Sequence, residues 1–109
     1  MSHRKIHYTT IDIGRDFSVT PNGRFYNDSP DCAEALFMMI QEALENSNHV
    51  YIEFNSLLQV GSSFLAHLAR MVVSNHCSEL VTVSSDCDWV LRRYQEYFDI
   101  YYREWRFGL

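Results

Sequence analysis

The chain has 109 residues, a length typical of one domain, and 47% of its residues are apolar and 15% aromatic. This composition excludes a disordered chain, which is poor in aromatic and branched side chains, and it predicts one domain over residues 1–109. There are 14 acidic and 9 basic residues, which gives a formal net charge of -5. No stretch concentrates basic side chains as a nucleic-acid binder requires, and the longest apolar run, 35–40, is too short to cross a membrane. We therefore expect neither nucleic acid nor a membrane among the partners.

The cysteines and the start of the chain predict a cytoplasmic protein. Cys32, Cys77 and Cys87 are an odd set without a CxxC pair or metal-ligand spacing. Such a set is typical of reduced thiols in the cytosol. The basic first residues lack the apolar segment of a secretory signal. We expect no metal and no other cofactor.

The first half of the chain predicts a strand, a turn and a helix. Partial alternation of apolar and polar residues indicates a strand over 6–17. Residues 21–23, Pro-Asn-Gly, predict a turn, and 24–26 fit a short returning strand. The Ser-Pro-Asp sequence at 29–31 is typical of a helix start. Apolar residues at helical spacing follow until Asn46, namely Ala33, Leu36, Phe37, Ile40 and Leu44.

The second half alternates strands and helices. Strands are predicted over 49–54 and 80–84, each followed by a helix, and a last strand over 100–102. Strands separated by helices imply largely parallel pairing. We predict the α/β class, with a four- or five-stranded mixed sheet and about three helices mainly on one face. The expected core includes Ile13, Leu36, Ile40, Ile52, Phe54, Leu65, Leu68, Val83 and Leu91.

The segment from Val50 to Leu65 carries the most information about function. A buried strand leads into a loop, and Ser62 and Ser63 then stand at the start of a helix. The free backbone N–H groups and the dipole of a helix favour an anion at this end. A purely structural alternative is that Ser62 caps the helix and Ser63 lies in its first turn.

This segment resembles the STAS domains, the family of bacterial anti-sigma-factor antagonists, whose signature is a strand, a spaced Leu and an Asp-Ser-Ser/Thr-Gly-Leu turn that opens a helix. Here the turn reads Gly-Ser-Ser-Phe-Leu over 61–65. An uncharacterised STAS-like bacterial branch is more similar, with its Ser-Ser-Phe-Leu turn at 62–65, an Asp-Phe-Ser strand end at 16–18 and a Gly-Arg turn at 23–24. The ordered matches run from about residue 11 to 102.

The resemblance implies a regulatory protein-binding module with a STAS-like fold. In the antagonists, the first serine of the turn accepts a phosphate from a partner kinase, which implies Ser62 here and a histidine-kinase-like ATPase as partner. The sequence departs from the family at Gly61, where the family has Asp, and at Phe64, where it has Gly. The docking loop that this hypothesis predicts is Gln59, Gly61, Ser62, Ser63 and Phe64.

A second hypothesis is a stand-alone inhibitor or immunity-type protein, such as a phage or toxin-antagonist protein, that acts by binding another protein. Tyr, Trp and Arg are enriched at protein interfaces. The last part of the sequence is rich in them, and the interface that this hypothesis predicts consists of Tyr101, Tyr102, Arg103, Trp105 and Arg106. An enzyme is not expected, because no nucleophile has a base at a suitable spacing. In particular, His67 lies five residues after Ser62 and is expected on a different helix face.

Overall fold

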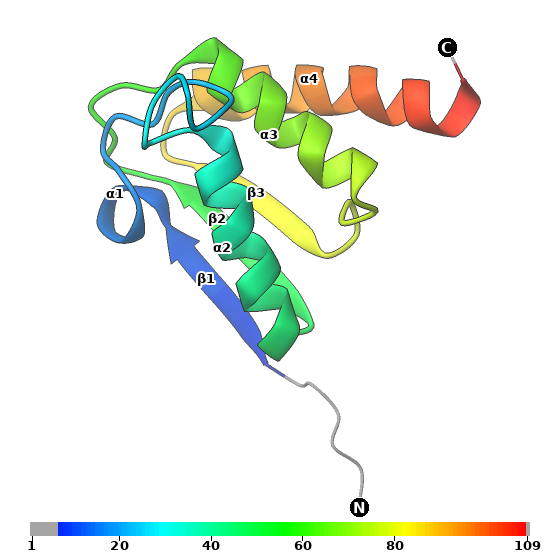
Figure 1. Ribbon diagram of the computed structural model, residues 1–109, viewed down its shortest axis with the longest axis horizontal. Helices are drawn as coiled ribbons and strands as arrows, with labels where there is room; N and C mark the ends of the chain where they lie inside the picture. The colour runs from blue at the N-terminus through cyan, green and yellow to red at the C-terminus, as the bar shows by residue number, and fades with distance from the viewer. Residues whose placement is uncertain (1–6, 109) are drawn as a thin grey trace, which may run out of the picture.

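The computed structural model describes residues 7–108, and a sheet of three parallel strands forms its centre (Figure 1). The strands are β1 (Tyr8–Asp12), β2 (His49–Phe54) and β3 (Val81–Ser85), and they lie in the order β1-β2-β3. Ile11 pairs with Ile52 and Ile52 with Val83, so these three side chains point to the same side of the sheet. The α/β class is confirmed for the described residues, and their sheet has three strands rather than four or five and is parallel rather than mixed.

One face of the sheet is covered and the other is open. On β2, Val50, Ile52 and Phe54 are buried, whereas the alternate residue Tyr51 is exposed. On the open face Tyr8 packs edge-on against Tyr51, with ring centroids 5.3 Å apart. The alternation of β2 is therefore that of a strand with one solvated face.

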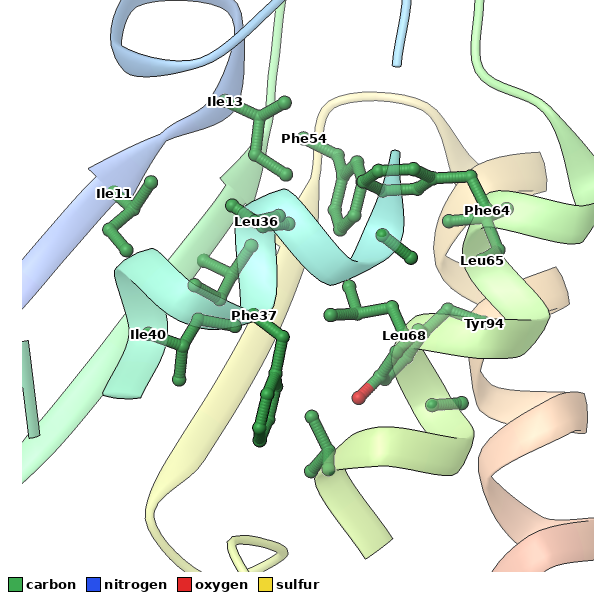
Figure 2. Close-up of a cluster of buried hydrophobic side chains, with 14 of the residues drawn as sticks. Ile11, Ile13, Leu36, Phe37, Ile40, Phe54, Phe64, Leu65, Leu68 and Tyr94 are labelled. Atoms are coloured by element: carbon green, nitrogen blue, oxygen red, sulfur yellow. The ribbon is translucent and has the colours of Figure 1, made fainter. Parts of the chain in front are cut away.

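Three long helices cover the buried face: α2 (Ala33–Asn46), α3 (Ser62–Ser74) and α4 (Asp88–Phe107). Helix α3 lies between the other two and packs against both (Figure 1). It buries residues at helical spacing, including Phe64, Leu65 and Leu68, against the side chains of α2 and the strands (Figure 2). The core thus continues from β1 through α2 and α3 to the first turns of α4.

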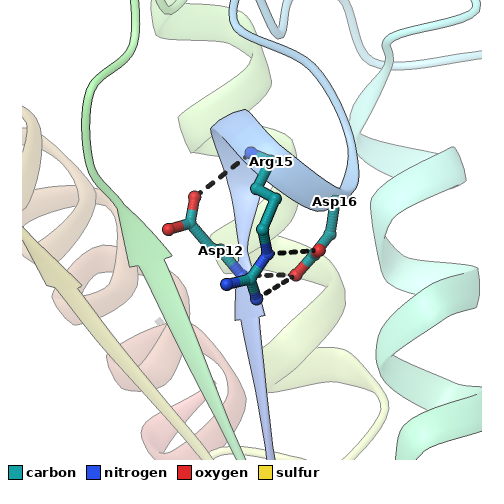
Figure 3. Close-up of polar contacts among 3 residues, drawn as sticks. All are labelled: Asp12, Arg15 and Asp16. Atoms are coloured by element: carbon teal, nitrogen blue, oxygen red, sulfur yellow. Dashed lines mark hydrogen bonds and ion pairs between the residues drawn. The ribbon is translucent and has the colours of Figure 1, made fainter.

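The first predicted strand ends five residues early, at Asp12, and a one-turn helix, α1 (Ile13–Asp16), follows it. The Asp12 carboxylate accepts a hydrogen bond from the backbone N–H of Arg15 at 3.2 Å, which caps this turn (Figure 3). The Asp16 carboxylate accepts the N–H of Asp12 at 2.9 Å and pairs with the Arg15 guanidinium at 2.8 Å. These local bonds compete with strand pairing. Residue 6 of the predicted strand lies outside the described residues.

Two other predicted strands are absent from the described part of the chain. Residues 24–26 form bends and a turn, where the Asp28 carboxylate accepts the N–H groups of Arg24 and Phe25. Residues 100–102 belong to α4, which continues to Phe107 and ends at the left-handed residue Gly108. Neither Gly nor Pro interrupts the helix before that point.

Seven of the nine predicted core residues are buried: Ile13, Leu36, Ile40, Ile52, Phe54, Leu65 and Leu68. Val83 and Leu91 are half-buried instead. Both line an open groove between α4 and the free edge of β3. Because no strand of residues 7–108 pairs with the outer side of β3, this edge of the core is open in the described structure.

Neighbouring residues of β1 provide a test of the one-sided sheet. Ile11→Ala is expected to lower the free energy of unfolding by about 2–5 kcal/mol, because it removes buried methylene groups and leaves a cavity. Thr10→Val, on the open face, is expected to change it by less than about 0.5 kcal/mol. Urea denaturation followed by circular dichroism measures both. Equal effects of the two substitutions would contradict the assignment of the faces.

Candidate functional site

The loops that follow β2 and β3 lie side by side at the end of the sheet where the strands have their carboxyl ends. Because the strands are parallel, their carboxyl ends lie at the same edge, where the loops of α/β proteins form binding sites. The Asp86 carboxylate accepts the backbone N–H of Ser56 at 3.0 Å. The Ser85 hydroxyl donates to the carbonyl oxygen of Phe54 at 2.8 Å and accepts the N–H of Cys87 at 3.0 Å. The bonds Ser56–Asp86 and Ser85–Phe54 join the two segments and hold the loops in a fixed relation.

Between these loops lies a mainly apolar hollow of about 310 Å³, which we call the loop pocket. Its most exposed apolar residues are Leu58 at 81% and Trp89 at 39%. Exposed side chains of this size at a concave site are typical of a binding surface. The residues that line the loop pocket are Phe54, Leu57, Leu58, Gln59, Val60, Asp86, Cys87, Trp89 and Val90.

Ser62 is exposed at the first position of α3. The residue that caps this helix is Gly61, so the hydroxyl of Ser62 does not have the capping role of the structural alternative. Gly61 is fixed by its N–H, which donates to the carbonyl oxygen of Pro21 at 3.1 Å. The Ser62 hydroxyl is thus accessible at the positive end of a 13-residue helix.

The other residues of the predicted docking loop differ in exposure. Gln59 is exposed, and Gly61 and Ser63 are half-buried. Phe64 is fully buried, with ring centroids 6.2 Å from Phe17 and 6.3 Å from Phe54. Phe64 therefore anchors the loop in the core and presents no side-chain surface to a partner.

The residues of the alternative interface do not share one face of α4. Tyr101 is half-buried, with the Arg70 guanidinium 6.0 Å from its ring centre. Tyr102 stacks on Phe98 within the helix. Trp105 lies against His76, beyond the end of α3, and is 49% exposed. Arg103 and Arg106 are exposed.

The described residues bring no base to the Ser62 hydroxyl. His67 lies against the ring of Phe25, with centroids 4.8 Å apart, and partial burial lowers its pKa. Within residues 7–108, no three His, Cys, Asp or Glu side chains form a group that could hold a metal ion. No helix in the same part of the chain has the length and hydropathy needed to cross a bilayer.

Sequence reasoning missed Leu58, Cys87 and Trp89 as members of the site. Leu58 and Trp89 lie 31 positions apart along the chain and line the same hollow because β2 and β3 pair in parallel. A signal was present, since Trp89 lies at the start of the helix that was expected to follow the strand predicted over 80–84. Two loops that follow neighbouring parallel strands are expected to adjoin.

Comparison of the chain with protein-family models, with curated proteins and with solved structures found no match.

The thiols provide a test of the loop pocket's accessibility. Cys87 is exposed, whereas Cys32 and Cys77 are buried, and burial raises the pKa of the Cys77 thiol. A disulfide reagent such as DTNB reacts with accessible thiolates. In the native protein we expect one thiol to react rapidly, Cys87→Ser to abolish that phase, and denaturant to expose all three. A rapid phase that survives in Cys87→Ser would contradict the placement of this loop.

Proposed function

We propose that the protein is a regulatory protein-binding module that docks a partner through the loop pocket and the adjoining start of α3. The observation that carries the proposal is the exposure of Leu58 and Trp89 on either side of one apolar hollow. A few residues, with Trp, Tyr and Arg enriched among them, supply most of the binding energy of protein interfaces, and Trp89 is of this kind.

Partner binding at this edge of the sheet is also supported by its rigidity. Backbone N–H groups of Leu58 and Gln59 donate to the carbonyl oxygen of Val19 at 2.9 and 3.3 Å. Together with the buried ring of Phe64, these bonds hold the loop before a partner arrives. A pre-organised loop loses little conformational entropy on binding, which favours affinity.

The resemblance to STAS domains adds a switch at Ser62 and suggests a cytoplasmic histidine-kinase-like ATPase as the partner. Phosphorylation adds about 1.5 to 2 negative charges at neutral pH. At the first position of α3 the helix dipole would stabilise this charge in the free protein. A partner packed on the same surface would instead desolvate it, so phosphorylation would release the partner.

The second candidate is a stand-alone inhibitor that binds its target through the C-terminal end of α4. It is favoured by the exposure of Trp105, Arg103 and Arg106 and by the extension of this end beyond α3 (Figure 1). A hollow of about 350 Å³ adjoins Trp105 and Arg106. This candidate places the contacts far from Ser62, so the same variants distinguish the two.

Substitutions at Ser62 test the docking face. A photo-cross-linking residue at position 58 would capture the partner for identification, and calorimetric titration would then compare variants. We expect Ser62→Asp to weaken binding at least tenfold and Ser62→Ala to preserve it. Ser62→Asp should leave the free energy of unfolding within about 1 kcal/mol of the wild type, because a negative charge suits this helix end.

Two further variants serve as controls for this titration. Ser74→Asp introduces the same charge at the exposed far end of α3 and is expected to leave affinity unchanged. Leu58→Ala removes the most exposed apolar anchor and is expected to weaken binding without loss of stability. If Ser62→Asp and Leu58→Ala bind as the wild type does while Trp105→Ala does not, the C-terminal candidate replaces the loop pocket.

A further inference from the structure

The outer side of α4 has no partner within the described chain. Tyr94 and Phe98 face β3, and Tyr101 faces α3 through Arg70. The side of the helix that bears Asp88, Arg92 and Asp99 borders an open groove, which Val83 lines at the free edge of β3. It presents five exposed charged residues; Glu96 pairs with Arg93, and the other four are Asp88, Arg92, Asp99 and Arg103.

These four charges lie on one stripe, because their spacings of four, seven and four residues return to the same side of a helix. None of them forms an ion pair within residues 7–108, where the pairs are Arg15–Asp16 and Arg93–Glu96. Asp99 accepts only a hydrogen bond from the Gln95 amide at 3.2 Å. These four charges therefore form no ion pair of their own, although Asp88 with Arg92 and Asp99 with Arg103 attract each other weakly along the helix at a spacing of four residues.

The order of charges on the stripe is self-complementary. If two α4 helices lie antiparallel about a two-fold axis that passes between Gln95 and Glu96, Arg92 of each copy faces Asp99 of the other, and Asp88 faces Arg103. A shift of one turn toward the C-terminus would instead oppose Arg92 with Arg103 and Glu96 with Asp99. The first of these registers pairs the four charges of the stripe that form no ion pair and places Glu96, which pairs with Arg93, opposite Gln95, as an isologous interface allows.

The free edge of β3 lies next to Gln95 and Glu96, the residues between which the axis passes. Val83, the middle residue of β3, lines a groove of about 590 Å³ together with Leu91 and Gln95. Leu80 accepts the bond from Val50 of β2, so the alternation of a parallel strand turns the backbone groups of Val81 and Val83 toward the free edge. An unpaired edge of this kind invites a second chain.

We propose that the protein forms a two-fold symmetric homodimer through the outer stripe of α4, with the free edge of β3 covered beneath it. The occupant of this face is a second copy of the chain, because the stripe matches itself in charge. The interface depends on neither Ser62 nor the loop pocket, so it stands independently of the proposed function.

Reciprocal charge reversals test the register. Arg92→Asp opposes Asp with Asp, and Asp99→Arg opposes Arg with Arg, so sedimentation velocity should show each variant dissociating at least tenfold more readily than the wild type. An equimolar mixture of the two variants restores both pairs and should form a heterodimer of wild-type affinity. Glu45→Arg, on the exposed side of α2, is the control and should leave the dimer intact.

The dimer should also weaken as salt is added, because exposed charge pairs are screened. Circular dichroism would show that each variant keeps its helices. If the wild type is monomeric at all attainable concentrations, the proposal is wrong, and the stripe is then expected to bind a different protein. A dimer indifferent to both reversals, or two monomeric variants that do not recombine, would equally overturn the proposal.

Discussion

The burial of α3 is the constraint on which the rest of this structure depends. A sheet of three strands is too narrow to enclose a core by itself, and α3 completes that core by packing against β2, α2 and α4 together. Its residues Phe64, Leu65, Leu68, Ala69 and Val72 are all at most 1% exposed. Such a helix can be held only if its first turn is fixed, and Phe64 fixes it between Phe17 and Phe54. The loop that precedes Phe64 is therefore placed by the core, which is why a functional surface there is rigid.

Periodicity predicted the elements whose side chains alternate between core and solvent. Strand β2 and helices α2 and α3 are of this kind, and their core residues were predicted correctly because one burial pattern spans each element. At the end of β1, where the predicted strand was too long, local hydrogen bonds determined the structure. Asp12 and Asp16 turn the chain after β1, which hydrophobic alternation at Ile11 and Ile13 does not reveal. Residues 100–102, Ile-Tyr-Tyr, have high strand propensity, yet Tyr101 and Trp105 find partners in Arg70 and His76 only when α4 continues.

The candidate site could be predicted only where one segment forms it. The sequence identified the exposed serine at the start of α3, because a strand, a loop and a helix start follow each other there. The loop pocket requires Leu58 and Trp89 from two loops, and their approach depends on the parallel register of β2 and β3. The burial of Phe64 is a similar case, since its contacts with Phe17 and Phe54 are long-range. A family pattern that treats 61–65 as one surface motif therefore combines an exposed residue with a core residue.

The proposed dimer would also determine how the two loop pockets are presented. If its two-fold axis is normal to the sheet, the β3 strands of the two copies are antiparallel and their carboxyl ends point in opposite directions. The two loop pockets would then lie at opposite ends of the dimer, and two partners could bind without contact between them. The same symmetry places Arg103 of each α4 opposite Asp88 of the other, one residue before Trp89 at the rim of the loop pocket.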